Sequence, residues 1–107
     1  MKASLMFLLL ALTGAADAAA PVSKDVAIAL TKESFVPETA TVPAGAHIVW
    51  TNNDSVPHSV TANDGRFDSG PLLPGKTFEW TVSGAGNIAY HCIYHPSMTA
   101  TLTVKGK

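Results

Sequence analysis

Four side chains of this sequence could bind one transition metal together. Cys92, His95 and Met98 follow one another at intervals of three residues in "CIYHPSM", and His58 lies in "VPHSV". A thiolate with two imidazoles and a weak axial thioether is typical of a type 1 copper site, which transfers electrons. Protein would fill all four positions and leave none open for a substrate. The residue types and their spacing therefore predict an electron-transferring copper site.

Other chemistry can be written for the same residues. Cys92 is the only cysteine of the chain, and a single cysteine is often a buried structural thiol. Cys92 and His58 could also form a nucleophile and base pair in an enzyme. Neither alternative explains Met98 or the regular spacing after Cys92. Zinc, which accepts cysteine and histidine ligands, could occupy the same site.

The two remaining histidines are not expected to reach this metal. His91 precedes Cys92 on a predicted strand, so its side chain points to the opposite face. His47 begins a strand far in sequence from the other candidates. We expect both to be structural or solvent-facing.

The N-terminus has the pattern of a secretory signal peptide. Lys2 gives a positive start, residues 5–12 form an apolar run, and the small residues "ADA" end at Ala18. The run is too short for a membrane span, which takes about 20 residues. We expect residues 1–18 to be cleaved, with the boundary between 18 and 20. Residues 19–107 are then a single domain in the periplasm.

The rest of the chain alternates short apolar strands with turns and has no helical period. In "DVAIAL" the apolar side chains occupy every second position, and "KTFEWTV" and "MTATLTV" show the same period, which is typical of strands. Residues 63–76 are rich in glycine, proline and aspartate and are predicted to be a long loop. Seven or eight short strands in a small domain indicate two packed sheets. The charges are scattered around a net charge of −1, so no nucleic-acid surface is expected.

This pattern resembles the cupredoxins, the small blue copper proteins, and within them the amicyanins of the plastocyanin-like group. The resemblance covers "FVPETATVPAG", "VWTNNDSVPHSV", "FDSGPLLPGKTFEWTVSGAGNIAYHC" and the short ligand loop "CIYHPSM". It implies an all-β, eight-stranded Greek-key sandwich with one copper ion bound by His58, Cys92, His95 and Met98. It also implies that the edge of His95 lies in an apolar surface patch, where electrons pass to and from partner proteins.

Four further residues are expected to shape this site. The resemblance suggests that Asn52 braces the first ligand loop. Pro96 is expected to shape the surface around His95 and to restrict the rotation of that ring. Ser59 stands where these families usually have an asparagine that ties the ligand loops, so we expect a weaker tie. Tyr94 stands where amicyanins have proline, and its N–H is expected to be a second donor to the Cys92 sulfur, which would raise the reduction potential.

The sequence thus predicts a monomeric electron carrier rather than an enzyme. Its partners would be transient redox proteins, and the resemblance suggests a c-type cytochrome or a dehydrogenase. The alternative is a periplasmic copper chaperone or storage protein on the same fold. Such proteins often lack the thiolate or use methionine-rich sites, whereas this chain has Cys92 and keeps only Met98 after residue 18.

Overall fold

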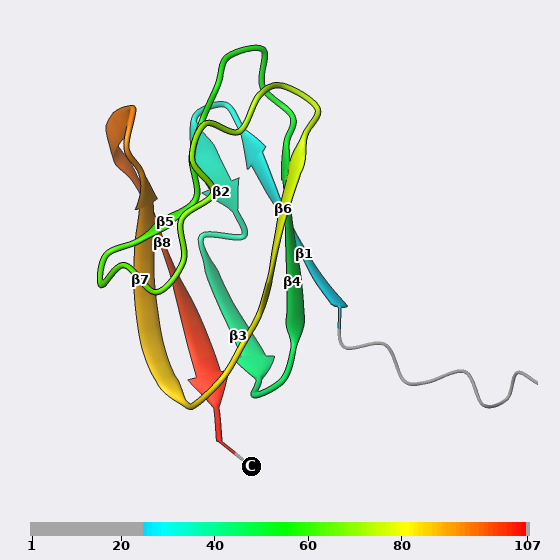
Figure 1. Ribbon diagram of the computed structural model, residues 1–107, viewed down its shortest axis with the longest axis vertical. Helices are drawn as coiled ribbons and strands as arrows, with labels where there is room; N and C mark the ends of the chain where they lie inside the picture. The colour runs from blue at the N-terminus through cyan, green and yellow to red at the C-terminus, as the bar shows by residue number, and fades with distance from the viewer. Residues whose placement is uncertain (1–24, 107) are drawn as a thin grey trace, which may run out of the picture.

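The computed structural model describes residues 25–106, which form two four-stranded sheets packed face to face (Figure 1). One sheet, in the order β2-β1-β4-β6, consists of β1 (Asp25–Thr31), β2 (Ser34–Val36), β4 (His47–Asn52) and β6 (Thr77–Thr81). The other, in the order β3-β8-β7-β5, consists of β3 (Thr39–Pro43), β5 (Thr61–Ala62), β7 (Gly86–Cys92) and β8 (His95–Lys105). The predicted all-β, eight-stranded sandwich is confirmed.

The signal peptide predicted for residues 1–18 lies outside the described residues. Within residues 25–106 no helix is long and apolar enough to cross a membrane.

Both sheets mix parallel and antiparallel strand pairs. β1 pairs with β4 and β3 pairs with β8 in parallel, whereas the other pairs are antiparallel. Parallel neighbours cannot be joined by a tight hairpin, so the chain crosses between the sheets before and after β3. These crossovers bring segments that are distant in the sequence to the same end of the sandwich.

The alternation in the sequence sets which face of each strand is buried. On β8, Met98, Ala100, Leu102 and Val104 are buried between the sheets. Because successive side chains of a strand point to opposite faces, the intervening threonines lie on the outer side. The period-two pattern predicted this face correctly.

Trp50 and Tyr90 lie at the centre of the core, one from each sheet. Trp50 Nε1–H donates a hydrogen bond to Tyr90 Oη at 3.2 Å, and the two rings meet edge to face at 5.6 Å. Phe67 also enters this core, although its segment was predicted to be a loop, and its ring lies 4.7 Å from that of Trp80. Trp80 and Phe78 are only partly buried against this core.

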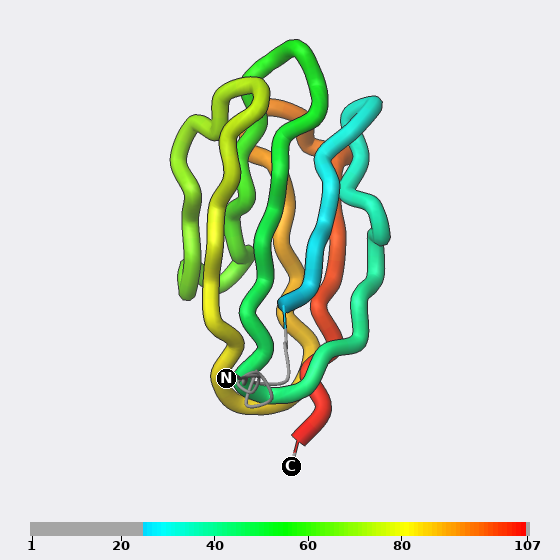
Figure 2. The backbone as a smooth tube through the Cα atoms, turned by 90° about the vertical axis from the view of Figure 1, so that its right-hand side faces the viewer, coloured from blue at the N-terminus to red at the C-terminus, as the bar shows by residue number. Residues whose placement is uncertain are grey.

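One end of the sandwich collects the loops that carry the candidate site. The β1–β2, β4–β5 and β7–β8 connections and the segment before β6 gather there (Figures 1 and 2). The β3–β4 and β6–β7 turns lie at the opposite end, together with the C-terminus. We call the first of these the loop end.

Candidate metal centre

Cys92 lies at the centre of the candidate site, as the last residue of β7, and its side chain is fully buried. Its Sγ is 3.7 Å from His58 Nδ1 and 3.6 Å from His95 Nδ1. One ligand atom from each of the three side chains lies within 4.8 Å of the other two. These are the only side chains among residues 25–106 that cluster in this way. The structure thus brings His58 to the Cys92–His95 segment, as predicted.

The β7–β8 turn positions Cys92 and His95 side by side. Cys92 pairs with His95 across a two-residue turn made by Ile93 and Tyr94. His91 then pairs with Thr99, so the register shifts between His91 and Cys92. Residues 96–98 are the extra residues on β8, and such a bulge re-aims side chains locally.

Met98 is the last residue of this bulge and is buried at 3% exposure. β8 begins at His95, so Met98 lies within the strand rather than at its start. The Met98 side chain lies on the same inner face of β8 as Ala100, near the end of the strand that carries His95. Met98 therefore follows His95 by three residues on β8, and its side chain is buried on the inner face of the strand.

The His58 backbone is fixed by the segment that precedes β6. His58 N donates to Leu72 O at 3.0 Å, and Leu72 N donates to His58 O at 2.7 Å. The preceding Pro57 fixes its own φ and so stiffens the approach to the ligand. His58 is fully buried, so its ring can contact only protein or a bound ion.

Ser59 ties the two ligand segments together more fully than its size suggested. Its backbone N–H donates to Cys92 Sγ at 3.3 Å. Its Oγ accepts the Ile93 N–H at 2.9 Å and is hydrogen-bonded to Thr61 Oγ1 at 2.9 Å. The serine hydroxyl therefore reaches the β7–β8 turn directly and ties it to the His58 loop.

Asn52 braces the β4–β5 loop from the end of β4. Its Nδ2 donates to Val56 O at 2.9 Å and to Leu72 O at 2.8 Å. Its Oδ1 accepts the Asp54 N–H at 2.9 Å. Asn52 is fully buried, so these bonds satisfy an amide that water cannot reach.

Tyr94 does not play the expected part. In residues 25–106, Ser59 is the only residue whose backbone N–H donates to Cys92 Sγ. Tyr94 occupies the second position of the tight turn and its side chain is exposed. The second donor predicted for the sulfur is therefore absent from the part of the chain that the structure describes. Pro96 lies in the bulge, exposed beside His95.

Thiolate, imidazole and thioether donors together fit copper better than other biological metals. A buried pocket that presents one Cys and two His atoms at this spacing would also accept zinc, but zinc does not require the thioether.

Comparison with known proteins agrees with this geometry. A sequence profile of the Cupredoxin-like domain family matches residues 4–104. The chain belongs to the cupredoxin family. The family binds a type 1 copper, and the His-Cys-His donor set with Met98 fits that cofactor.

Individual relatives support the same placement of this cupredoxin. It is 28% identical to amicyanin from Paracoccus versutus over 94 residues, which cover 82% of this chain and 71% of that protein. It is 33% identical over 87 residues to the chloroplastic plastocyanin minor isoform of Arabidopsis thaliana. That match covers 67% of this chain and about half, 51%, of the plant protein.

Solved structures share the fold. A novel purple cupredoxin from Nitrosopumilus maritimus is 29% identical with a TM-score of 0.68, and the match covers 76% of this chain and 100% of that one. A copper-containing nitrite reductase from Thermus scotoductus is 22% identical with a TM-score of 0.70. The match covers 79% of this cupredoxin and only 23% of the reductase chain, so it shows the fold alone.

Asp54 is a site residue of this cupredoxin that the sequence reasoning missed. Its Oδ2 lies 2.7 Å from His58 Nε2. Burial acts to raise the pKa of Asp54, but hydrogen bonds from Glu33 N, His58 and Lys32 N outweigh it and hold the pKa below its ordinary value. The only signal in the sequence was the spacing of four residues between Asp54 and His58.

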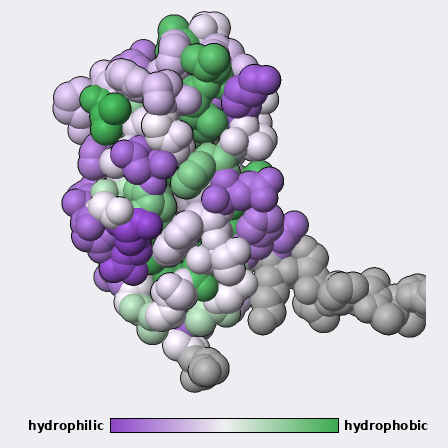
Figure 3. All heavy atoms as spheres, viewed as in Figure 1, coloured by the Kyte–Doolittle hydropathy of each residue, from purple (hydrophilic) through white to green (hydrophobic). Residues whose placement is uncertain are grey.

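His95 is the histidine of the site that reaches solvent. Its side chain is 27% exposed, and its Nε2 lies 3.8 Å from Glu33 Oε2. Four large exposed apolar side chains lie on the loops of the same end, namely Val56, Leu73, Ile93 and Tyr94. Figure 3 shows hydrophobic side chains reaching the surface at the loop end.

The other two histidines lie apart from the site, as predicted. His47 is half-exposed. Its Nδ1 lies 3.1 Å from Asp25 Oδ1 and its Nε2 lies 2.9 Å from Glu79 Oε1. His91 Nδ1 is hydrogen-bonded to Asn63 Oδ1. Both histidines are thus bound to side chains outside the candidate metal site.

Proposed function

We propose that this cupredoxin is an electron carrier that holds one type 1 copper ion through His58, Cys92, His95 and Met98. The observation that carries the proposal is the approach of the two imidazole Nδ1 atoms to one buried thiol, at 3.7 Å and 3.6 Å. Met98 would add the thioether donor that is typical of type 1 copper sites. When bound, copper supplies a one-electron couple between Cu(II) and Cu(I).

The hydrogen bonds of the protein would keep the ligand geometry nearly the same in both oxidation states. Asn52 and Ser59 hold the ligand loops through buried hydrogen bonds, so the ligands are held before the metal arrives. The Ser59 N–H withdraws charge from the thiolate. Because little has to move, electron transfer is favoured over chemistry that makes bonds.

Electrons would enter and leave through His95. It is the candidate ligand with an exposed edge, and exposed apolar side chains lie on the loops of the same end. Interfaces of redox carriers are small and transient, and an apolar rim suits a partner that must dissociate after each transfer. The resemblance suggests a c-type cytochrome or a dehydrogenase as the partner, with the carrier acting as a monomer.

An enzyme is a weaker proposal for this chain. The four protein ligands leave no open coordination position for a substrate. His47 and His91 are the remaining histidines, and both are engaged elsewhere on the protein surface. A copper chaperone or storage protein remains the alternative, and a buried thiolate ligand does not favour it.

The N-terminal pattern supports export. Lys2, the apolar run at 5–12 and the small residues up to Ala18 favour a cleaved signal peptide and a mature periplasmic domain of residues 19–107. An exported carrier with a single cysteine needs that cysteine protected from oxidation, and a bound metal would protect it.

Optical spectroscopy tests the proposal directly. Adding Cu(II) to the purified mature chain should give an intense blue thiolate-to-copper absorption that disappears on reduction and returns on oxidation. Cys92→Ser should abolish the colour, whereas His47→Gln, a change outside the site, should keep it. A pale wild-type product, or one that cannot be reduced reversibly, contradicts the electron-carrier function.

A further inference from the structure

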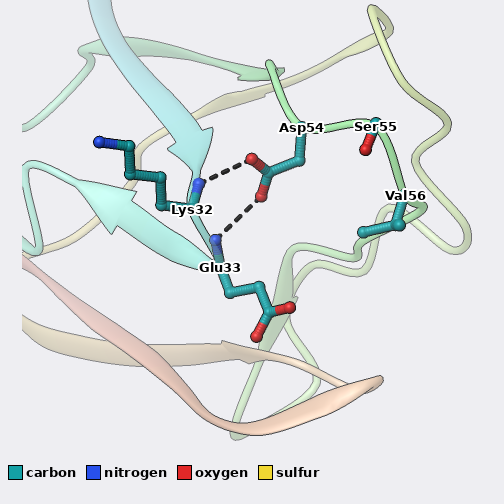
Figure 4. Close-up of a pocket in the computed structure, with 5 residues that line it drawn as sticks. All are labelled: Lys32, Glu33, Asp54, Ser55 and Val56. Carbon is teal, nitrogen blue, oxygen red and sulfur yellow. Dashed lines mark hydrogen bonds between the residues drawn. The ribbon is translucent and has the colours of Figure 1, made fainter.

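The carboxylate of Asp54 connects two separate segments of the loop end. It contacts the His58 ring through Oδ2 at 2.7 Å. It also accepts the Lys32 N–H on Oδ1 at 2.6 Å and the Glu33 N–H on Oδ2 at 2.9 Å (Figure 4). Lys32 and Glu33 form the β1–β2 turn, which no copper ligand belongs to. Asp54 is thus the link between that turn and His58.

The β1–β2 turn adopts a backbone conformation that its residues disfavour. Thr31 pairs with Ser34 across a two-residue loop, and Lys32 and Glu33 have φ values of 54° and 57°. Hairpin loops of this kind usually contain Asn-Gly, because both residues need positive φ. Side chains with a Cβ atom are disfavoured there, and such conformations persist only where neighbouring groups hold them. The Asp54 carboxylate, which accepts both N–H groups, is such a neighbour.

We propose that Asp54 is a positioning residue of the copper centre, which fixes the tautomer and orientation of His58 and couples them to the β1–β2 turn. The inference rests on the proposed ligation of copper by His58. If Nε2 carries the proton that Asp54 accepts, Nδ1 is the nitrogen left to bind the metal. Nδ1 is also the atom that lies 3.7 Å from Cys92 Sγ. A carboxylate behind a ligating histidine also makes that histidine a more basic ligand.

The same turn also faces the second histidine of the site. Glu33 Oε2 lies 3.8 Å from His95 Nε2, while the Glu33 N–H is held by Asp54. The Nε2 atoms of both imidazoles therefore face carboxylates connected to the β1–β2 turn. Glu33 belongs to this turn, and Asp54 accepts the N–H groups of its two residues. This places the β1–β2 turn beside the ligand loops as a third support of the centre.

The Asp54→Asn variant tests the proposal because it keeps the size of the side chain and removes its charge. Changes to partners behind metal ligands typically cost about 10–100-fold in metal affinity. A nearby negative charge stabilises Cu(II) more than Cu(I), so the variant should lose more Cu(II) affinity. We expect the equilibrium between the two states to shift about tenfold toward Cu(I), which is a rise of about 59 mV for one electron.

Asp64→Asn is the matched control, since Asp64 is an exposed carboxylate paired with Arg66 rather than with a site residue. It removes the same charge and should leave the potential and the blue absorption close to those of the wild type. If Asp54→Asn and Asp64→Asn give the same potential, Asp54 does not position the centre.

A second pair of variants separates positioning from folding. Replacing the turn by Asn-Gly (Lys32→Asn with Glu33→Gly) should let the turn form without help from Asp54. In that background Asp54→Asn should leave the thermal unfolding of the copper-free protein nearly unchanged and still raise the potential. Loss of the potential shift in this background would show that Asp54 acts only on fold stability.

The copper-free protein gives a readout that is independent of the metal. Nitrogen NMR of the His58 ring should show the Nε2–H tautomer in the wild type and in Asp64→Asn, and a mixture of tautomers in Asp54→Asn. A colourless wild type would contradict the proposed copper function, whereas unchanged tautomers in Asp54→Asn would contradict the role of Asp54. The two failures are therefore distinguishable.

Discussion

Ser59 Oγ accepts a hydrogen bond from Ile93 N at 2.9 Å, and this contact joins the His58 loop to the β7–β8 turn. The same residue donates its own N–H to Cys92 Sγ. A single buried serine thus holds the two segments that carry the candidate ligands in one arrangement. The resemblance to other families pointed to an asparagine in this role, but a hydroxyl is sufficient where the backbones approach closely.

Ser59→Ala should destabilise the protein and loosen the site. The variant leaves the partly buried Ile93 N–H without its acceptor, and an unsatisfied donor costs up to about 1–3 kcal/mol where it is buried. Urea unfolding of the copper-free protein measures the loss. Ser55→Ala is the control, because Ser55 is exposed on the same loop, and it should change the free energy of unfolding by less than about 0.5 kcal/mol. Equal effects of the two variants would mean that the Ser59 contact does not support the loops.

Asn52→Ala should be more damaging than Ser59→Ala. It removes both donors to Val56 O and Leu72 O and the acceptor of Asp54 N–H. Leu72 O keeps the His58 N–H, whereas Val56 O and the Asp54 N–H both lose their partner. Each unpaired group costs about 1–3 kcal/mol where it is buried, and Ser59→Ala leaves only one such group. Asn53→Ala, one residue further along in an exposed position, is the matched control for thermal unfolding. If Asn52→Ala unfolds at the same temperature as Asn53→Ala, Asn52 does not brace the loop.

Tyr90→Phe should lower the free energy of unfolding at neutral pH. At alkaline pH the free energy of unfolding should fall less steeply in the variant than in the wild type. The variant removes the acceptor of the Trp50 N–H, which is worth about 0.5–1.5 kcal/mol. Burial, opposed by that hydrogen bond, raises the pKa of Tyr90 from 10.0 to about 12.

The folded state therefore keeps Tyr90 neutral where the unfolded state ionises. This contribution is fully present below pH 10 and is lost as the pH rises toward 12. Unfolding free energies measured between pH 9 and pH 12, roughly spanning both pKa values, should fall less steeply for Tyr90→Phe. Parallel pH profiles would show that Tyr90 is not protected from ionisation.

His47 should make the copper-free protein more stable in mild acid. Its hydrogen bond to Asp25 is the main cause that raises its pKa, burial opposes it, and Glu79 adds to the rise. A raised folded-state pKa gives a stability that is fully present below the ordinary value of 6.5 and is lost as the pH rises through the folded-state value. The free energy of unfolding should show this decline when it is measured from about pH 5 to about pH 9, a range that includes the ordinary pKa and a raised one.

Two variants check the assignment to His47. His47→Gln cannot titrate and should remove the decline. Glu79→Gln removes one of the two neighbouring carboxylates and should move the decline to lower pH. If His47→Gln keeps the wild-type pH profile, another group is responsible.

The strand pattern and the local ligand spacing were predictable from the sequence because both depend on near neighbours. Alternating apolar residues predicted the buried face of β8, and the interval from Cys92 through His95 to Met98 predicted a metal-binding turn. The involvement of His58 followed from residue type and the resemblance. Asn52 was expected to brace the loop on the same ground, and its hydrogen bonds are present.

Other features depended on contacts that no local pattern encodes. Phe67 enters the core because the segment before β6 folds back across the sheet edge. Among residues 25–106 only the Ser59 N–H donates to Cys92 Sγ, so Tyr94 does not act as a sulfur donor. Ser59 ties the two loops because they approach within hydrogen-bond distance.

The sequence by itself determined which residues could bind copper and that they stand on strands and turns. Residue chemistry and period-two alternation are local properties, so they can be read directly from the chain. Only the tertiary structure decided which backbone and side-chain groups surround those ligands. Asp54 reaches His58 and the β1–β2 turn together because crossovers between the sheets gather loops that are distant in the sequence at one end.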